Sequence, residues 1–382
     1  MGKCPIYKKC NGCQLMNMED YNEQLKWKQK QVARLFEGVC GVRHIVGAED
    51  PFHYRNKAQP VFRMTRDGKT VSGIYQSANN GVAAIDSCLL ENKRANEITV
   101  EVRKLMKSFK LLPADGKGSK GFLRSLLIRT GAKSGEIMVV FVTEGPIFPS
   151  KNNFVKALIK QCPDITTVIH SINSSENFLT VGNRQTVLYG SGKIKDTLCG
   201  CTFSISPSSF YQINPAQTER LYNIAMEFAH LTGEERVIDA YCGTGTIGII
   251  ASKKAGVVIG VESNKAAVND ARENAKLNKC RNMSFACEDA GKFMRDLAEN
   301  DMSADVVFAD PPRNGCSQEF LDSVAILKPQ KLVYISCNPE TQVRDIKYLM
   351  QKGYKPTIVQ PVDMFPHTKH VESVCLMSRV DK

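Results

Sequence analysis

The sequence predicts an α/β protein that combines a doubly wound, Rossmann-like parallel sheet with a smaller, β-rich α+β domain. Three observations carry this prediction. Strands and helices alternate from residue 236 onward, a G-x-G-x-x-G motif follows the first of these strands, and hairpin patterns fill much of residues 54–192. The 382 residues are enough for two or three domains.

The composition is that of a globular protein with excess positive charge. Hydrophobic residues make up 42% of the chain and charged residues 24%, the net charge is +12 and the pI is about 9.0. This balance favours a polyanionic partner, nucleic acid first, over a basic protein without such a partner. Because the chain shows neither a membrane-length apolar run nor a signal peptide, we expect a cytoplasmic protein with no membrane contact. No protein partner is implied.

Three cysteines lie close together near the N-terminus. Cys4, Cys10 and Cys13 form the pattern C-x5-C-x2-C. Since cytosolic thiols stay reduced, three close thiols indicate metal ligation rather than a disulfide or a packed core. Zinc and an iron–sulfur cluster both suit such ligands, and a fourth ligand must come from elsewhere in the chain.

The segment that follows, residues 18–39, predicts an amphipathic helix. Its apolar stripe consists of Leu25, Val32, Leu35 and Phe36. Its opposite, basic face carries Lys26, Lys28 and Lys30. We expect this helical segment, residues 17–46, to pack on the C-terminal domain.

The predicted β-rich domain comprises residues 1–16 and 47–202, including the three cysteines. A hairpin is predicted over residues 58–76 about Asp67-Gly68, with two more over 126–143 and 178–192 and a short helix over 153–161 between the last two. We expect this domain to expose basic side chains that can meet phosphates, namely Lys117, Lys120, Arg124 and Arg129.

Residues 203–382 form the predicted C-terminal domain. Asn214 and Pro215 mark the start of a helix, as N-cap and first helical residue. Strands are predicted at 236–241, 257–262, 283–289, 304–310 and 331–337, and helices at 246–254, 265–277, 290–299, 318–327 and 340–351. The last two strand-like runs, 356–362 and 372–380, are close enough in sequence to pair antiparallel.

A nucleotide-type cofactor site is predicted at the first of these strands. Gly243, Gly245 and Gly248 form G-x-G-x-x-G between a strand and a helix, which allows a tight turn and close approach of backbone to a ligand. Glu262 ends the next strand, where a carboxylate can accept hydrogen bonds from ribose hydroxyls. The motif alone fits a dinucleotide, S-adenosylmethionine or a plain structural turn.

The loop after the fourth strand favours S-adenosylmethionine. Asp310 ends that strand in "ADPPRNG", and two prolines stiffen a loop that can line a planar base. In enzymes that methylate amino groups the comparable motif ends with an aromatic residue. Arg313 occupies that place here, which argues against methylation of an exocyclic amine. As an alternative, Asp310 is a turn former or helix cap.

A thiol and a carboxylate converge on the same edge of the predicted sheet. Cys337 ends the fifth strand, and Asn338-Pro339 lead into a helix whose N-terminal amides favour a thiolate. Glu372 begins the last strand. Together they can act as a nucleophile and a base beside one cofactor pocket.

Five motifs in this order resemble the RNA (uracil-5-)-methyltransferase family: "SPSSFYQINPAQTERLY", "DAYCGTGTIG", "DPPRNG", "ISCNPET" and "HVESV". The resemblance covers essentially the whole chain and is strongest over residues 204–382. It implies a Rossmann-like S-adenosylmethionine-dependent methyltransferase domain, with Cys337 as catalytic nucleophile and Glu372 as general base. It also implies S-adenosylmethionine contacts from Gln212, Tyr241, Glu262, Asp289 and Asp310.

The N-terminus resembles the ribosomal-RNA members of this family, in which three cysteines in this spacing and a distant fourth hold a [4Fe–4S] cluster. By that likeness Cys88 is the fourth ligand, with Cys40 as its rival, and 23S rRNA is the substrate. Unlike the longest members, the chain begins at the cysteine motif, so we expect no N-terminal OB-like (TRAM) domain. The alternatives are a tRNA T-loop uridine methyltransferase, an NAD-dependent oxidoreductase and a non-catalytic RNA-binding protein.

Overall fold

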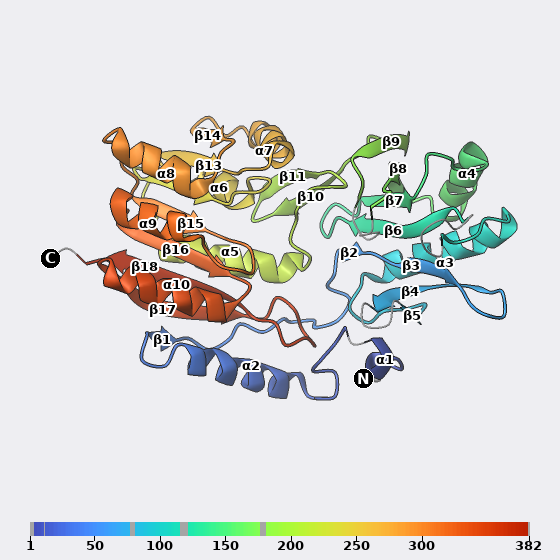
Figure 1. Cartoon of the computed structure of the whole chain (residues 1–382), viewed down its shortest axis with the longest axis horizontal. Helices are drawn as coiled ribbons and strands as arrows, with labels where there is room; N and C mark the ends of the chain where they lie inside the picture. Colours follow the sequence, from blue (N-terminus) through green and yellow to red (C-terminus); the bar gives the residue numbers. More distant parts are fainter. Residues whose placement is uncertain (1–3, 11, 77–80, 115–120, 176–180, 381–382) are drawn as a thin grey trace. The chain divides into compact units, whose positions relative to one another are not determined.

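The computed structural model describes residues 4–10, 12–76, 81–114, 121–175 and 181–380, which divide into two compact units (Figure 1). Unit 1 comprises Met1–Asn17, Asp50–Thr197 and Ser204–Ser208. Unit 2 comprises Met18–Glu49, Leu198–Phe203 and Ser209–Lys382. Among the described helices, none combines the length and the apolar character needed to cross a membrane.

Within the described residues, unit 2 is built on an eight-stranded sheet with the order β1-β17-β18-β16-β15-β12-β13-β14. Its strands are β1 (Gly41–Val42), β12 (Arg236–Ala240), β13 (Val257–Val261), β14 (Met283–Ala286), β15 (Val306–Ala309), β16 (Lys331–Ser336), β17 (Tyr354–Val362) and β18 (Glu372–Arg379). Strands β12 to β16 run parallel, whereas β18 runs antiparallel to both β16 and β17. The predicted doubly wound sheet and the antiparallel final pair are confirmed.

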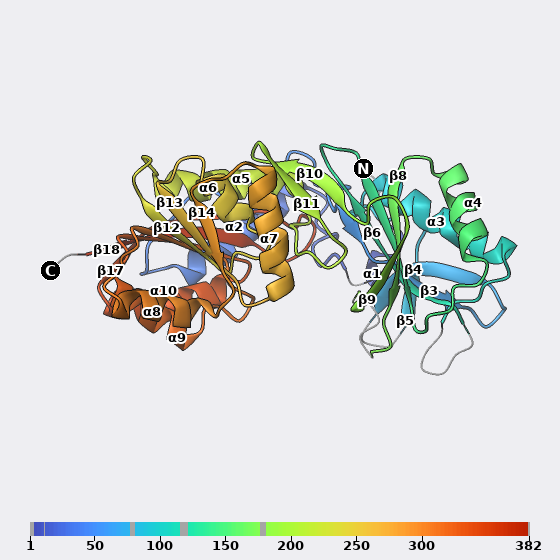
Figure 2. The same cartoon turned by 90° about the horizontal axis from the view of Figure 1, so that it is seen from above.

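Helices cover both faces of this sheet (Figure 2). They are α2 (Tyr21–Leu35), α5 (Pro215–Ala229), α6 (Thr246–Ala251), α7 (Lys265–Leu277), α8 (Ala290–Glu299), α9 (Gln318–Leu327) and α10 (Pro339–Gln351). One face carries α8, α9 and α10, and the other carries α5, α6 and α7. The core on the first face packs Phe320 and Ile346 against Val307 and Tyr334 of the central strands.

Helix α2 begins where Asp20 caps its first turn, since the Asp20 side chain accepts a hydrogen bond from Asn22 N at 2.9 Å. Val32 and Phe36 of the predicted apolar stripe are buried in the core that α10 shares. The prediction that Lys28 belongs to the exposed basic face is wrong, because its side chain is 0% exposed. Its Nζ lies 2.6 Å from Oδ1 of Asp363, an ion pair that a helical pattern cannot reveal.

Unit 1 is built on a second sheet with the order β5-β4-β3-β6-β7-β8-β9, and β2 pairs with β6. Its strands are β2 (Lys57–Ala58), β3 (Val61–Met64), β4 (Thr70–Gln76), β5 (Gly81–Ala84), β6 (Leu123–Thr130), β7 (Ile137–Thr143), β8 (Ile165–Ile172) and β9 (Arg184–Tyr189). Its helices are α1 (Tyr7–Cys10), α3 (Lys93–Ser108) and α4 (Lys151–Gln161). Strands β10 (Ile194–Leu198) and β11 (Cys201–Ile205) form a separate two-stranded sheet.

Two of the three predicted hairpins are present in unit 1. Strands β3 and β4 pair antiparallel about the Asp67-Gly68 turn, and β6 pairs antiparallel with β7. The third predicted hairpin, over residues 178–192, begins in residues that lie outside the described part of the chain. Its second half forms β9, whose antiparallel partner is β8.

Helix α3 was not predicted, although its sequence carries the signals of a helix. Asn92 caps it by accepting a hydrogen bond from Arg94 N at 2.9 Å. Ile98, Val102 and Met106 are each 0% exposed and face the core at helical spacing. The hairpins on both sides led the prediction to treat the whole region as β-rich.

The expectation that Arg124 and Arg129 are exposed is wrong, since they are 9% and 4% exposed. Arg124 Nη1 donates to the carbonyl oxygens of Asn173 at 2.6 Å and Ser175 at 2.9 Å. Its guanidinium therefore ties strand β6 to the end of β8. The other two basic residues of that expectation, Lys117 and Lys120, lie outside the described residues.

Candidate active site

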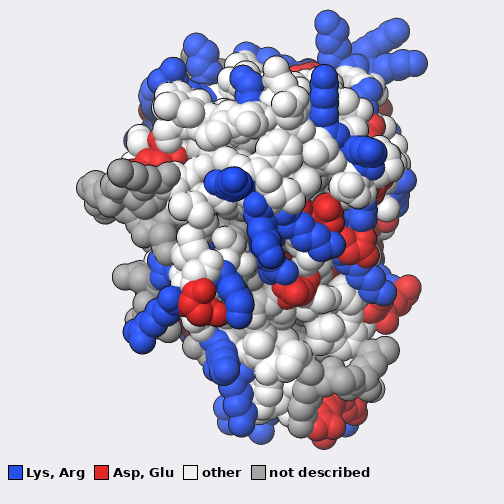
Figure 3. Space-filling view, turned by 90° about the vertical axis from the view of Figure 1, so that its right-hand side faces the viewer, with Lys and Arg blue, Asp and Glu red and all other residues white. Residues whose placement is uncertain are grey.

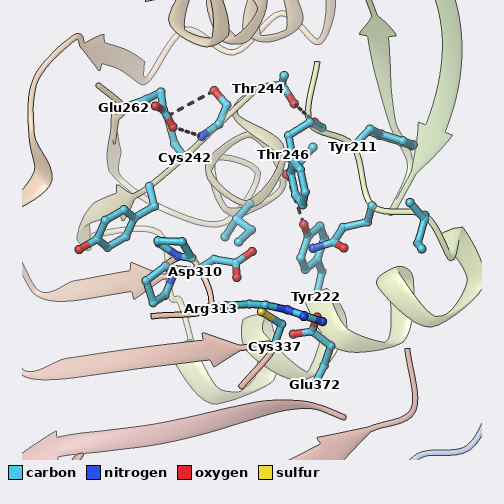
Figure 4. A pocket seen from close by; sticks show the side chains of 18 of the residues that line it. Tyr211, Tyr222, Cys242, Thr244, Thr246, Glu262, Asp310, Arg313, Cys337 and Glu372 are labelled. Carbon is cyan, nitrogen blue, oxygen red and sulfur yellow. Dashed lines mark hydrogen bonds between the residues drawn. The ribbon is translucent and has the colours of Figure 1, made fainter. Parts of the chain in front are cut away.

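The carboxyl edge of the parallel strands in unit 2 encloses a cavity of about 700 Å³ (Figure 4). The strand order reverses between β12 and β15, and open α/β sheets bind ligands at such a reversal. The cavity is lined by the loops after β12, β13, β15 and β16, by the segment before α5 and by the start of β18. A cavity of this size suits a cofactor or small ligand.

The glycine motif lies in the loop after β12. Gly243 and Gly245 have φ values of 54° and 81°, in the left-handed region where glycine has no steric penalty. Gly248 lies in α6, and its N–H donates to Asp239 Oδ2 at 2.7 Å. A Cβ at Gly248 would lie 2.9 Å from Asp239 Oδ2 and 3.2 Å from Asp239 Cβ, so a side chain there would disturb the close contact between α6 and β12.

Glu262 holds its carboxylate against this loop. Its Oε2 accepts a hydrogen bond from Gly243 N at 3.1 Å, and its Oε1 accepts one from Asn264 N at 2.8 Å. Tyr241, at the end of β12, has a φ of 62°, which is uncommon for a residue with a side chain. Its ring packs against Phe320 with centroids 5.2 Å apart, which fixes its position in the cavity wall.

Gln212 reaches the cavity from the segment before α5. That segment is oriented by Asn214, whose side chain accepts a hydrogen bond from Gln217 N at 3.3 Å and so caps α5. The side chain of Gln212 also hydrogen-bonds the buried Tyr222, whose hydroxyl lies 3.4 Å from Thr246 Oγ1. These bonds link the start of α5 to the start of α6 across the cavity.

Cys337, Arg313, Glu372 and Asp310 gather at the end of the cavity away from Glu262 (Figure 4). Cys337 follows β16, Asp310 and Arg313 follow β15, and Glu372 begins β18 next to β16. Glu372 is 3% exposed, whereas Cys337 is only half-buried. Cys337 lines the same cavity as the glycine loop.

Enclosure shifts the two carboxyl groups and the thiol at this end towards their neutral forms. Burial raises the pKa of Glu372 to about 8, with a further contribution from Asp310, and raises the pKa of Asp310 to about 7. Burial also raises the pKa of Cys337 to about 11, assisted by the negative charges of Glu372 and Asp310. Arg313 opposes these shifts by its charge at Glu372 and by its charge and a hydrogen bond at Cys337.

The loop that carries Arg313 is tied to the loop that carries Cys337. The carbonyl oxygen of Arg313 accepts hydrogen bonds from Asn338 Nδ2 at 3.1 Å and Thr341 Oγ1 at 3.3 Å. Both donors lie at the start of α10, directly after Cys337. The backbone of Arg313 is therefore fixed relative to the backbone of the thiol.

A comparison with known families identifies the family of this chain. Residues 20–380 match the model of a family described as tRNA (Uracil-5-)-methyltransferase. The chain belongs to this tRNA (uracil-5-)-methyltransferase family. The family resemblance drawn from the motifs is thus confirmed at the level of an S-adenosylmethionine-dependent RNA uracil-5 methyltransferase.

Relatives of this uracil-5-methyltransferase chain match nearly its whole length. A protein of Halalkalibacterium halodurans is 40% identical over 380 residues, which are 98% of this chain and 82% of the relative. One of Staphylococcus aureus is 39% identical over 98% of this chain and 83% of its own length. Both are named as uncharacterized RNA methyltransferases.

A solved structure is similar in fold to this uracil-5-methyltransferase chain. It is the tRNA (uracil-54, C5)-methyltransferase of Pyrococcus abyssi in complex with S-adenosyl-L-homocysteine. The TM-score is 0.77 at 28% identity, over 94% of this chain and 83% of that one. The family and this neighbour support S-adenosylmethionine over a dinucleotide as the cofactor.

Most of the predicted site residues of this methyltransferase line the one cavity: Cys337, Glu372, Gln212, Tyr241, Glu262 and Asp310. Asp289 is not among the described residues that line it. Its carboxylate caps α8 by accepting a hydrogen bond from Gly291 N at 2.9 Å, and its charge acts on Tyr241. Sequence reasoning gave no site role to Arg313 or Tyr222, which depend on contacts between distant segments, nor to Phe210 and Phe365, which also line the cavity.

The four cysteines predicted as metal ligands interact electrostatically in unit 1. Burial raises the pKa of Cys13 to about 12, with contributions from Cys88, Cys10 and Cys4. Burial also raises the pKa of Cys10, and the charge of Cys4 adds to this shift. Burial raises the pKa of Cys88 to about 11. Cys4, Cys10 and Cys88 therefore lie close enough to Cys13 for their charges to affect its pKa.

The surroundings of these thiols include a half-buried cation, Arg55. The positive charge of Arg55 lowers the pKa of Cys10, Cys13 and Cys88. Its backbone N donates to Leu90 O at 2.9 Å, which holds it against the segment after Cys88. Within the described residues, no group of three or more His, Cys, Asp or Glu side chains is arranged closely enough to hold a metal ion as it stands.

We predict that Glu372→Gln stabilises the fold, and more at about pH 8 than at about pH 5. The native pKa of Glu372, about 8, lies above its usual unfolded value of roughly 4.3. Between these values the native state keeps a proton that the unfolded state has released, so the free energy of unfolding falls as the pH rises to about 8. Glutamine does not titrate, so the variant keeps the free energy of unfolding, on the order of 1–3 kcal/mol, that the wild type loses over this pH range.

Thermal unfolding of wild type and variant across this pH range measures the difference. Glu234→Gln, which removes an exposed carboxylate, is the matched control and should show no such pH-dependent gain. A Glu372→Gln difference that does not grow with pH would contradict the raised pKa.

Proposed function

We propose that this chain methylates C5 of uridine in 23S rRNA, with Cys337 as covalent nucleophile and Glu372 as general base. The single observation that carries the proposal is the placement of the Cys337 thiol, the Glu372 carboxyl and the Arg313 guanidinium in one cavity with the glycine loop. That placement joins a nucleophile, a base and a cation to a nucleotide-type site.

Covalent catalysis explains why the reaction needs a thiol. C5 of uracil is a poor nucleophile, because the conjugated ring holds its electrons. Addition of the Cys337 thiolate to C6 breaks the conjugation and leaves an enolate with carbanion character at C5. That carbon then takes a methyl group. Glu372 removes the proton from C5, the C5–C6 double bond re-forms, and the thiolate leaves.

The electrostatics of the cavity fit these roles. The pKa of Glu372, about 8, lies close to physiological pH, which suits a group that both accepts and releases a proton. Arg313 favours the Cys337 thiolate by its charge and a hydrogen bond, although burial still raises the pKa of Cys337 to about 11 in the free protein.

The co-substrate S-adenosylmethionine supplies the methyl group, and the predicted contacts to it keep their proposed roles. Glu262 presents its carboxylate beside the glycine loop, where it would accept hydrogen bonds from the ribose hydroxyls. Tyr241, Gln212 and Asp310 form other parts of the same wall. Asp289 remains a proposed contact on the strength of the family resemblance alone.

RNA is proposed to reach this cavity with the target base turned out of its stack. Extrusion of a base costs a few kcal/mol and least in a single strand or loop. The net charge of +12 favours binding to the phosphate backbone. Lysine and arginine side chains are spread over the face drawn in Figure 3, with fewer acidic side chains among them.

We further propose that Cys4, Cys10, Cys13 and Cys88 hold a [4Fe–4S] cluster. The charge of Cys88 contributes to the raised pKa of Cys13, which supports the choice of Cys88 as the fourth ligand. Cys40, its rival, belongs to unit 2 and interacts with Cys375 instead. The cluster would serve structure or RNA positioning, because no step of methyl transfer uses an electron.

The alternative substrate is tRNA. The structural similarity to the tRNA (uracil-54, C5)-methyltransferase of Pyrococcus abyssi favours this alternative. The cysteine motif favours ribosomal RNA. We predict that unmodified 23S rRNA transcript, but not tRNA transcript, gains 5-methyluridine when incubated with the protein and S-adenosylmethionine. Mass spectrometry of nuclease digests locates the product, and 5-methyluridine in tRNA alone would overturn the choice of substrate.

We also predict that RNA carrying 5-fluorouridine traps a covalent complex with the protein. Fluorine replaces the proton that Glu372 removes, so the thiolate cannot leave once the methyl group is in place. Cys337→Ala should abolish the complex, which denaturing electrophoresis detects. Cys242→Ala removes the other thiol of the cavity and is the matched control. A complex that survives Cys337→Ala would refute the nucleophile.

The proposed cluster predicts iron and acid-labile sulfide in anaerobically purified protein, at roughly four of each per chain. Cys13→Ser should lose most of both, whereas Cys287→Ser, which changes an exposed cysteine of unit 2, should retain them. Metal analysis and a sulfide assay provide the measurement. Stoichiometric zinc without sulfide would identify a different metal.

A further inference from the structure

The loop between β17 and β18, residues 363–371, forms part of one side of the cavity, next to the proposed base Glu372. Val362 pairs with Glu372 across the two strands, so Asp363 and Val371 are the two ends of the loop. Phe365, within the loop, lines the same cavity as Glu372. The position of the loop therefore sets the position of both side chains.

Helix α2 holds this loop from a distant part of the sequence. Lys28 Nζ lies 2.6 Å from Asp363 Oδ1, and both side chains are 0% exposed. The same Nζ donates to Phe365 O at 3.1 Å. The Tyr21 hydroxyl donates to Asp363 Oδ2 at 2.8 Å, so both oxygens of this carboxylate are bound by α2.

A second set of bonds fixes the middle of the loop. His367 N donates to Gln24 Oε1 at 3.1 Å, and Gln24 Nε2 lies 3.2 Å from His367 Nδ1. From the opposite side, Asn214 Nδ2 donates to Met364 O at 3.0 Å and Gln217 Nε2 donates to Asp363 O at 3.0 Å. The loop is therefore fastened between α2 and the start of α5, directly after Gln212.

A buried ion pair is poorly explained by stability alone. Removing two charges from water offsets much of their attraction, and an apolar pair of similar volume is often as stable. An ion pair with further hydrogen bonds does fix geometry, since each oxygen and proton accepts only certain partner positions. The polar contacts between α2 and the loop thus specify where the loop lies.

We propose that α2 is a strut for the proposed general base, with Lys28 and Asp363 as positioning residues that fix the β17–β18 loop and hence Glu372 and Phe365 in the cavity. The inference rests on the proposed function, because it concerns the step in which Glu372 removes the C5 proton. Neither Lys28 nor Asp363 lines the cavity, so both act through the loop.

The test replaces the ion pair by a neutral pair. Lys28→Met combined with Asp363→Asn removes both charges and leaves an amide oxygen for the Tyr21 hydroxyl, so no buried charge is left uncompensated. Lys30→Met makes the same change on the exposed face of α2 and is the matched control. Gln24→Leu, a milder variant, breaks the bonds to His367 and keeps the ion pair.

Each variant is assayed with radiolabelled S-adenosylmethionine on the transcript that the wild type methylates. We expect the double variant to turn over about 10- to 100-fold more slowly, as for a displaced catalytic group. Its affinity for S-adenosylmethionine, measured by calorimetry, should not change. A covalent complex with ordinary uridine RNA should accumulate, because thiol release waits for proton removal. Gln24→Leu should shift turnover in the same direction by less.

Three results would overturn the strut. The first is turnover of the double variant equal to that of Lys30→Met. The second is slow turnover without accumulation of the covalent complex. The third is loss of S-adenosylmethionine binding together with activity, because that result would give the ion pair a structural role only. Failure of the proposed function is distinguishable, because it appears in the wild type as the absence of a 5-fluorouridine complex. Failure of the strut appears only in the variants.

Discussion

The chemistry of the cavity depends on how the charge of Arg313 opposes the effect of enclosure. Enclosure raises the pKa of Cys337 and of Glu372, which favours the thiol and the protonated carboxyl. The proposed nucleophile and the proposed base act in the opposite forms. A guanidinium stays charged at any physiological pH, and its field is strong where water is excluded. The two bonds from the start of α10 to the Arg313 carbonyl fix the backbone that carries this side chain relative to the backbone of Cys337.

A raised pKa does not by itself mark a catalytic group in this protein. Burial raises the pKa of Asp239 to about 8, as it does for Glu372. The Asp239 carboxylate, however, accepts the N–H of Gly248 and fastens the glycine helix to β12. Glu372 instead faces the cavity beside a thiol. Location and neighbours therefore separate the structural carboxyl from the proposed base, and the pKa only adds to that distinction.

The sequence was most informative where a local pattern has one structural meaning. Alternating strands and helices predict a parallel sheet, and the carboxyl ends of parallel strands must meet at one edge. The meeting of Glu262, Asp310 and Cys337 therefore follows from the sequence alone. The prediction for Lys28 was wrong because its partner, Asp363, lies 335 positions away in the sequence. A helical pattern alone treats every lysine as exposed. Strand β8, the antiparallel partner of β9, was not among the predicted strands.

The proposed nucleophile and the proposed cluster ligands share one physical feature. Cys337 is enclosed with two carboxyl groups, and Cys10, Cys13 and Cys88 are enclosed with other thiols, so each set disfavours negative charge on sulfur. A cation, Arg313 or Arg55, partly offsets this in each case. Such sulfur atoms gain most from a partner that takes up the negative charge. In the proposed chemistry that partner is an electron-poor ring carbon at Cys337 and iron at the other cysteines, which is why enclosed thiols suit both roles.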